Sequence, residues 1–231
     1  MTLQIAALAS GVGTNVAAII KRIDDGLLDA KIRVVISNQP NAPVLEKAAN
    51  AGIPTYARSN ADFTNREAYD RELLAVACDA GADTIVLAGY MLMLTPTFVQ
   101  AYPKRILNVH PSILPSFPGR MGNEDAIRYG VRLSGSTVHF VEETMDQGPV
   151  VIQAVVPVHS TDTDTTLMPR IQAMEHRIYP QALQWLAEGR LKIEGQRVIL
   201  LPAKIPNISI ASFGQGPMGP WMVSPPLEEG F

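Results

Sequence analysis

An amide and an imidazole stand two residues apart where a short apolar segment ends. The segment reads Leu107-Asn-Val-His-Pro-Ser-Ile-Leu-Pro115 and continues a strand predicted over residues 105–109. In extended backbone, Asn108 and His110 point to the same side. An amide donor beside an imidazole suits a reaction that builds negative charge on a carbonyl oxygen and moves one proton. The spacing alone also fits a histidine satisfied at a strand end and an asparagine in a turn.

A glycine-containing turn follows the first predicted strand and leads into a helix. It reads Ser10-Gly-Val-Gly-Thr-Asn15. Glycine lets the backbone approach a ligand, and the free amides of a first helical turn attract phosphate, so Gly13, Thr14 and Asn15 are candidate phosphate contacts. Any tight strand-to-helix turn could use glycine in the same way. The turn lacks the Gly-Lys-Ser/Thr of triphosphate-binding loops and the G-x-G-x-x-G of dinucleotide folds.

A carboxylate stands in the turn between two predicted strands, in the sequence Asp146-Gln-Gly-Pro149. Aspartate often begins such a turn for structural reasons alone. If the fold brings Asp146 beside His110, the carboxylate would orient the ring and raise its pKa above ~6.5. The sequence leaves both interpretations open.

The remaining histidines carry weaker signals. His139 lies inside a predicted strand, where a structural role is the ordinary interpretation, and His159 and His176 do not share a metal-ligand spacing with it. We therefore predict no metal site. Glu175, on a predicted helix, is either a solvated charge or a group that holds the hydroxyls of a ribose.

Strands and helices alternate along the first half of the chain. This alternation predicts an α/β fold with a doubly wound, mostly parallel sheet flanked by helices. The predicted strands cover residues 3–9, 31–37, 53–57, 84–88 and 105–109, and the helices between them begin near Val16 and cover 44–51 and 62–80.

The second half of the chain departs from this alternation. Two strands, over 136–141 and 150–158, have no helix between them, which predicts a hairpin or a mixed edge of the sheet. A long kinked helix, or two successive helices, is expected over 164–189, where Pro180 interrupts the pattern. We expect one domain over 1–203 and a Pro/Gly-rich tail over 204–231, which drapes over the domain or is disordered.

Composition narrows the class of protein. Hydrophobic residues make up 47% and charged residues 18%, as in globular proteins. A formal charge of −3 and the lack of a basic run disfavour a nucleic-acid partner. The single cysteine, Cys78, fits a reducing compartment. The longest near-apolar run has ten residues, against the ~20 of a membrane span, so we expect a cytoplasmic protein without a membrane partner.

Taken together, these segments resemble the phosphoribosylglycinamide formyltransferase family, also called glycinamide ribonucleotide transformylases. The resemblance runs from about residue 3 to residue 191 and implies the Rossmann-like formyltransferase fold. Its motifs are Ser10-Gly-Val-Gly-Thr-Asn15, Arg66-Glu-Ala-Tyr-Asp-Arg-Glu-Leu73, Leu87-Ala-Gly-Tyr-Met91, Asn108-Val-His-Pro-Ser-Ile-Leu-Pro115, Thr137-Val-His-Phe-Val141, Asp146-Gln-Gly-Pro149 and Glu175-His-Arg-Ile-Tyr-Pro180.

The resemblance implies formyl transfer from 10-formyltetrahydrofolate to the amine of glycinamide ribonucleotide, a step of purine synthesis. The amine would attack the formyl carbon directly, while Asn108 and protonated His110 stabilise the oxyanion and Asp146 assists His110 and the proton transfer. Gln172 and Glu175 would contact the ribonucleotide, and Gly13, Thr14 and Asn15 its phosphate. The implied folate site consists of Arg66, Met91, Leu92, Met93, Leu94, Asn108, Glu142, Glu143, Thr144, Met145 and Asp146.

Two relatives offer alternatives on the same fold. Formyltetrahydrofolate deformylase uses a similar Asn, His and Asp set with water as the acceptor, and it usually carries a further N-terminal domain, whereas the first strand here begins at Leu3. Methionyl-tRNA formyltransferase carries an additional RNA-binding domain, for which the 28 residues after Ala203 are too few. A silent binding protein would not need a proton-transfer set. The chain departs from well-known members at Leu92, where they carry Arg. We expect small-molecule substrates and a monomer or homodimer.

Overall fold

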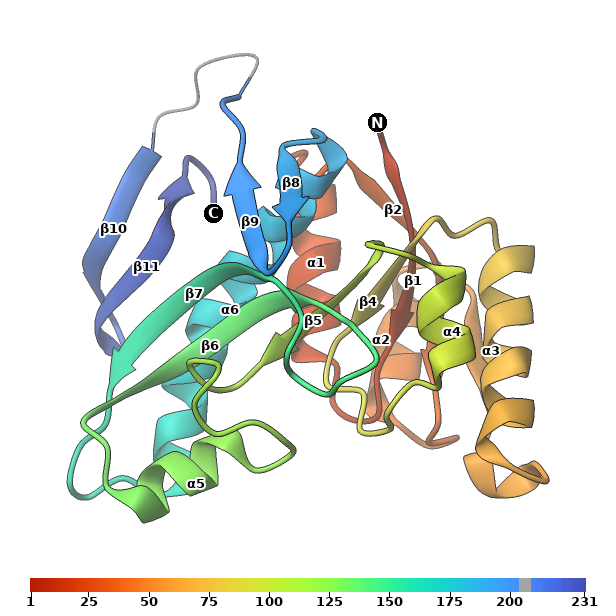
Figure 1. The fold of residues 1–231 in the computed structure, drawn as a ribbon, viewed down its shortest axis with the longest axis horizontal. Helices are drawn as coiled ribbons and strands as arrows, with labels where there is room; N and C mark the ends of the chain where they lie inside the picture. Colours follow the sequence, from red (N-terminus) through yellow and green to blue (C-terminus); the bar gives the residue numbers. More distant parts are fainter. Residues whose placement is uncertain (204–208) are drawn as a thin grey trace. The chain divides into compact units, whose positions relative to one another are not determined.

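The computed structural model describes residues 1–203 and 209–231 (Figure 1). The chain falls into two compact units. Unit 1 comprises Met1–Asn108 and Phe140–Glu143, and unit 2 comprises Val109–His139 and Thr144–Phe231. Each unit is described by itself.

Unit 1 contains a parallel sheet whose strands follow the predicted apolar runs. The strand order is β5-β4-β1-β2-β3, and every neighbouring pair is parallel. Nearly continuous apolar strands are expected where helices cover both faces of a parallel sheet. The strands are β1 (Leu3–Leu8), β2 (Ala30–Ser37), β3 (Thr55–Ala57), β4 (Thr84–Leu87) and β5 (Ile106–His110), of which β5 continues into unit 2.

The helices of unit 1 pack around this sheet, and α1, α2 and α3 each contact β2. They are α1 (Thr14–Asp24), α2 (Pro43–Asn50), α3 (Arg66–Asp79) and α4 (Pro96–Ala101), with a short 3-10 helix at Asn60–Asp62. The helix predicted from residue 62 begins at Arg66, because the Asn65 side chain accepts a hydrogen bond from the Ala68 amide (2.8 Å) and caps it there. The core joins the strands to α3 and α4 through Leu8, Ile36, Tyr69, Leu73, Ile85 and Phe98.

Unit 2 is built on the predicted hairpin. The strands β6 (Leu133–Phe140) and β7 (Val150–Pro157) are antiparallel, and α6 (Asp164–Ala187) packs on β7. The long helix expected over 164–189 is one helix that contains both Pro169 and Pro180. The α5 helix (Gly122–Tyr129) was not predicted. Parallel strands in unit 1 and antiparallel strands in unit 2 confirm the α/β class with a mixed sheet.

The C-terminal part of unit 2 contains four strands that the sequence analysis did not predict. They are β8 (Leu191–Glu194), β9 (Arg197–Leu200), β10 (Ser209–Gly216) and β11 (Gly219–Glu228). The expected tail begins at residues 204–208, which lie outside the described part of the chain. From 209 onward it forms a β10–β11 hairpin, and β11 pairs with β7 through Met222 and Val155.

In this hairpin, Gly214 leaves room for the ring of Trp221. A Cβ on Gly214 would lie 2.5 Å from Cζ2 of the Trp221 ring. The Arg177 guanidinium on α6 also contacts that ring, with its Cζ 4.5 Å from the ring centroid. Within the described ranges, no helix has both the length and the apolar character that a membrane crossing requires.

Candidate active site

The carboxyl ends of three strands in unit 1 stand at the same level. Leu8 of β1 pairs with Leu87 of β4, and Leu87 pairs with Asn108 of β5. The segments that follow β1 and β4 therefore leave the sheet at the edge where Asn108 lies. Open α/β sheets bind ligands outside the carboxyl ends of their strands, so this edge is where the predicted binding segments should lie.

One serine fastens two of these segments together. The Ser10 hydroxyl accepts a hydrogen bond from the Met91 amide (2.8 Å) and donates one to Oδ1 of Asn38 (2.5 Å). The Ser10 amide also donates to the carbonyl of Gly89 (3.0 Å). The glycine turn and the segment after β4 thus form one connected structure.

The glycine turn has a physical requirement for glycine at one position. Gly13 is the N-cap of α1 and has a φ of +72°, in the left-handed region. A Cβ there would lie 2.3 Å from Cγ2 of Val44, at the start of α2. As a glycine, the N-cap residue has no side chain that could accept a hydrogen bond from the first-turn amides of α1. The first-turn amides, which belong to the predicted phosphate contacts Thr14 and Asn15, suit an anion.

Arg66 makes a hydrogen bond to the backbone of residues 91–94, which were predicted to contact the folate. Its Nη2 donates to Oδ1 of Asp70 (2.9 Å) and to the carbonyl of Met93. The other oxygen of Asp70 accepts from the Thr95 amide (2.7 Å), so Asp70 and Arg66 together hold the end of the segment at Met93 and Thr95. Burial raises the pKa of Asp70, and the Thr95 and Arg66 contacts oppose that effect. The Nη1 of Arg66 is buried and has no hydrogen-bond partner among the described residues.

Side chains alternate along residues 91–94. Met91 and Met93 are 46% and 59% exposed, whereas Leu92 and Leu94 pack against the core of unit 1. Leu92 is therefore directed toward the core. Methionines present a flexible apolar surface at this edge.

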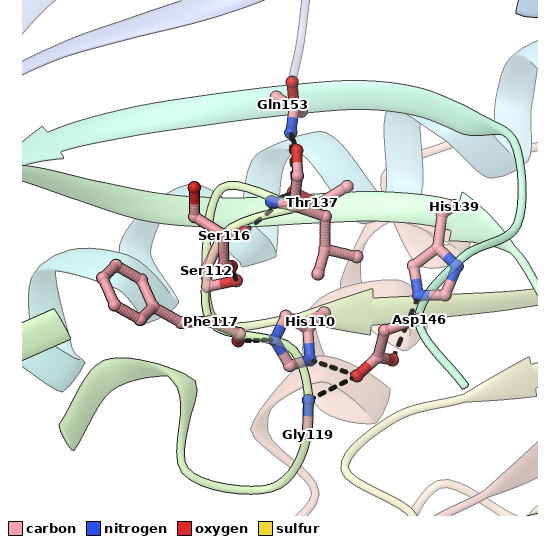
Figure 2. A network of polar contacts seen from close by, with 10 residues as sticks. His110, Ser112, Ser116, Phe117, Gly119, Thr137, His139, Asp146 and Gln153 are labelled. Carbon is pink, nitrogen blue, oxygen red and sulfur yellow. Dashed lines mark hydrogen bonds and ion pairs between the residues drawn. The ribbon is translucent and has the colours of Figure 1, made fainter. Parts of the chain in front are cut away.

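In unit 2, His110 and Asp146 lie together, as Figure 2 shows. The Nδ1 of His110 is 3.6 Å from Oδ2 of Asp146, and the two side chains are 5% and 9% exposed. On the other side of the ring, Nε2 lies 2.9 Å from the carbonyl oxygen of Phe117, to which it donates. The sequence supported the proximity of Asp146 to His110 only as a hypothesis, and in the structure the two side chains do lie together.

Asp146 occupies an unusual backbone conformation, with a φ of +55°. Its Oδ2 accepts a hydrogen bond from the Gly119 amide (2.7 Å), and its Oδ1 lies 3.8 Å from Nε2 of His139. Non-glycine residues adopt this conformation only where the surroundings hold them in it. The carboxylate is held in place from several directions.

The loop after His110 is fastened to the β6–β7 hairpin by polar side chains that the sequence analysis missed. Thr137 Oγ1 donates to the carbonyl of Ser112 (2.7 Å) and accepts from the Leu114 amide (3.0 Å). Gln153, the register partner of Thr137, donates from Nε2 to the Leu114 carbonyl (2.8 Å) and to Thr137 Oγ1 (3.0 Å). The signal that could have identified Thr137 and Gln153 was the occurrence of one polar residue in each of two neighbouring strands, at positions that pair with each other.

The predicted ribonucleotide contacts lie on α6. Gln172 and Glu175 are three residues apart on this helix and so share one face. Glu175 is 3% exposed, which excludes the interpretation of a solvated surface charge. Beside it, burial lowers the pKa of His176, whose Nε2 has no hydrogen-bond partner within the described residues.

The remaining predicted folate residues divide between the units. Glu142 and Glu143 belong to unit 1, where Glu143 accepts a hydrogen bond from Gln100 (2.8 Å), and Thr144 and Met145 belong to unit 2. Residues 1–203 and 209–231 hold no group of three or more His, Cys, Asp or Glu side chains placed to bind a metal ion.

The structure combines an α/β fold with a buried histidine–aspartate pair. The chain belongs to the formyl transferase family, whose model matches residues 3–183. Within this family it is similar to phosphoribosylglycinamide formyltransferases. It is 41% identical over 203 residues to that enzyme of Escherichia coli, which covers 85% of this chain and 96% of the relative.

Comparison with solved structures gives the same family. A glycinamide ribonucleotide transformylase from Symbiobacterium toebii has a TM-score of 0.85 at 44% identity, covering 87% of this chain and 94% of the other. A formyltetrahydrofolate deformylase from Pseudomonas syringae has a TM-score of 0.80 at 27% identity, covering 87% and 66%. The chain is thus similar in fold to both enzymes and nearer in sequence to the transformylase.

Proposed function

We propose that this chain transfers the formyl group of 10-formyltetrahydrofolate to the amine of glycinamide ribonucleotide. The products are formylglycinamide ribonucleotide and tetrahydrofolate, in de novo purine biosynthesis. The observation that carries the proposal is the buried pair of His110 and Asp146, with Nδ1 and Oδ2 3.6 Å apart, in a chain of the formyl transferase family. We place the reaction in the cytoplasm, in a monomer or homodimer.

The His110–Asp146 pair suits the charge that develops during acyl transfer. When the amine attacks the formyl carbon, the formyl oxygen becomes an oxyanion that needs hydrogen-bond donors. In His110 both ring nitrogens face acceptors, Asp146 on one side and the Phe117 carbonyl on the other, and a charged imidazole donates from both. Asn108, two residues before His110 in β5, supplies a second donor.

The Phe117 carbonyl and the oxyanion compete for the same proton. Nε2 is the nitrogen of His110 that does not face Asp146, so it is the one that serves the substrate. The carbonyl of Phe117 must withdraw from Nε2 when the formyl oxygen binds there. The proton that the amine loses then passes, with assistance from Asp146, to the departing folate nitrogen, and no covalent enzyme intermediate is required.

Unit 1 supplies groups that suit the two substrates. The N-terminus of α1, at Gly13, Thr14 and Asn15, holds the phosphate of the ribonucleotide, and its glycine N-cap has no side chain to compete for the first-turn amides. The exposed side chains of Met91 and Met93 offer apolar surface for a pterin ring. The Nη1 of Arg66, which has no hydrogen-bond partner within residues 1–203 and 209–231, offers a buried donor.

The other assigned contacts complete this proposal. Gln172 and the buried carboxylate of Glu175 hold the ribose, because two neighbouring hydroxyls are suitable donors to a carboxylate. In unit 1 we assign Glu142 and Glu143 to the folate as well, together with the partly buried Leu92 and Leu94. In unit 2 we assign Thr144, Met145 and Asp146 to it.

The second candidate is hydrolysis of the formyl group, favoured by the fold shared with the deformylase. A water acceptor has no use for a phosphate-binding helix terminus. The two functions separate in an assay of tetrahydrofolate release with 10-formyltetrahydrofolate as donor. Release that requires glycinamide ribonucleotide supports the transferase, whereas equal release without it, with formate as product, means that the chain is a deformylase.

A further inference from the structure

His139 is a buried polar residue in β6, and the backbone pairing of the strand does not require a histidine there. Its side chain is 2% exposed, and its Nε2 is directed at Oδ1 of Asp146, 3.8 Å away. Figure 2 shows the Asp146 carboxylate between the rings of His110 and His139. The β6–β7 register shifts between Val138 and His139, and such irregularities turn side chains toward functional sites.

Each oxygen of Asp146 has its own partners. Oδ2 accepts from the Gly119 amide at 2.7 Å and faces Nδ1 of His110 at 3.6 Å. Oδ1 faces His139. The torsion that rotates a carboxylate about its own axis is broad, so a carboxylate held through one oxygen alone turns readily. A donor at Oδ1 fixes the orientation of Oδ2.

We propose that His139 is a positioning residue, whose Nε2–H attracts Oδ1 of Asp146 and so keeps Oδ2 directed at His110. The inference rests on the proposed function, because it concerns the same His110–Asp146 pair. At 3.8 Å the attraction is that of an ion pair or of a polar N–H toward a carboxylate, longer than a direct hydrogen bond. His139 contacts no substrate in this account, so its loss slows turnover and leaves substrate affinity unchanged.

Two substitutions at this position separate a donor from mere bulk. His139→Leu fills similar space without a donor, and His139→Gln places an amide N–H near the position of Nε2. Exposed His159 provides the control variant His159→Leu. We expect kcat of His139→Leu to fall at least about tenfold, the usual effect of losing a charge-assisted contact, with both KM values within about twofold of wild type.

His139→Gln should recover kcat to within about threefold of wild type, and His159→Leu should match wild type. Unchanged kcat in His139→Leu would overturn the proposal, and so would a Gln variant as slow as the Leu variant, because the donor would then be irrelevant. The Gln variant keeps the test valid if the Leu variant does not fold.

A spectroscopic experiment tests the contact without any turnover. The imidazole nitrogens of His139 are followed by ¹⁵N NMR in the wild-type chain and in Asp146→Asn. The proposal predicts a shift of the His139 Nε2 resonance, with His159 unmoved, and an unmoved His139 resonance would overturn it. A shifted resonance in a chain that shows no formyl transfer would refute the proposed function and leave the contact standing.

Discussion

Replacement of Gly13 by alanine gives a sharp prediction, because the chain contains a matched control. Gly13 and Gly26 have nearly the same backbone conformation, with φ values of +72° and +74°. A Cβ on Gly13 would lie 2.3 Å and 2.6 Å from two side-chain carbons of Val44, whereas a Cβ on Gly26 would meet nothing within 4 Å. The two alanine variants share the conformational cost and differ in the steric clash.

The expected magnitudes follow from this difference. A left-handed conformation costs an alanine about 1–2 kcal/mol, so Gly26→Ala should lower the free energy of unfolding by about that amount. Gly13→Ala adds the cost of overpacking against Val44, about 1–3 kcal/mol. Because relief of the clash moves the first-turn amides of α1, the KM for glycinamide ribonucleotide should rise about tenfold or more, while the KM for the folate stays within about twofold.

Urea unfolding and steady-state kinetics of both variants provide the assay. The reasoning predicts a further loss of stability in Gly13→Ala and a selective rise in the ribonucleotide KM. Equal stability of the two variants would show that the Val44 contact is irrelevant. An equal rise of both KM values in Gly13→Ala would refute the assignment of the turn to phosphate.

Three further predictions concern unit 2. Replacing His110 by alanine should lower kcat by about 10²-fold or more, with both ligands still bound in calorimetry; unchanged turnover would remove His110 from the mechanism. Burial holds the pKa of His176 below 6.5, so the unfolded chain binds more protons and stability falls as the pH drops below that value. In urea titrations at several pH values, His176→Gln should flatten this slope, and an unchanged slope would contradict the assignment. Glu228→Gln removes a buried partner of Arg190 (2.8 Å), which retains Glu188 (2.8 Å), so thermal unfolding should show a loss of about 1–3 kcal/mol rather than none.

The sequence predicted the elements whose signals are local. The strands of unit 1 are continuous apolar runs bounded by glycine and proline, and such runs form the strands of a parallel sheet with covered faces. The hairpin β10–β11 gave no such signal. Its glycines resemble those of a loop, and only the antiparallel pairing of β10 with β11, in which Gly214 lies opposite Trp221, shows that they belong to strands.

The candidate site divides in the same way. Asn108 and His110 were predicted because their spacing within one strand is visible in the sequence. The approach of Asp146 to His110 joins residues 36 positions apart, so the sequence supported it only as a hypothesis. Thr137 and Gln153 were missed, because each is an ordinary polar residue until the β6–β7 register places the two opposite each other.

The most direct measurement follows the fate of the formyl carbon. 10-Formyltetrahydrofolate labelled with ¹³C in the formyl group is mixed with glycinamide ribonucleotide and the wild-type chain in H₂¹⁸O, and the products are analysed by mass spectrometry. The account predicts ¹³C in formylglycinamide ribonucleotide with no ¹⁸O in its formyl group. ¹³C-formate that carries ¹⁸O, with an unlabelled ribonucleotide, would contradict it.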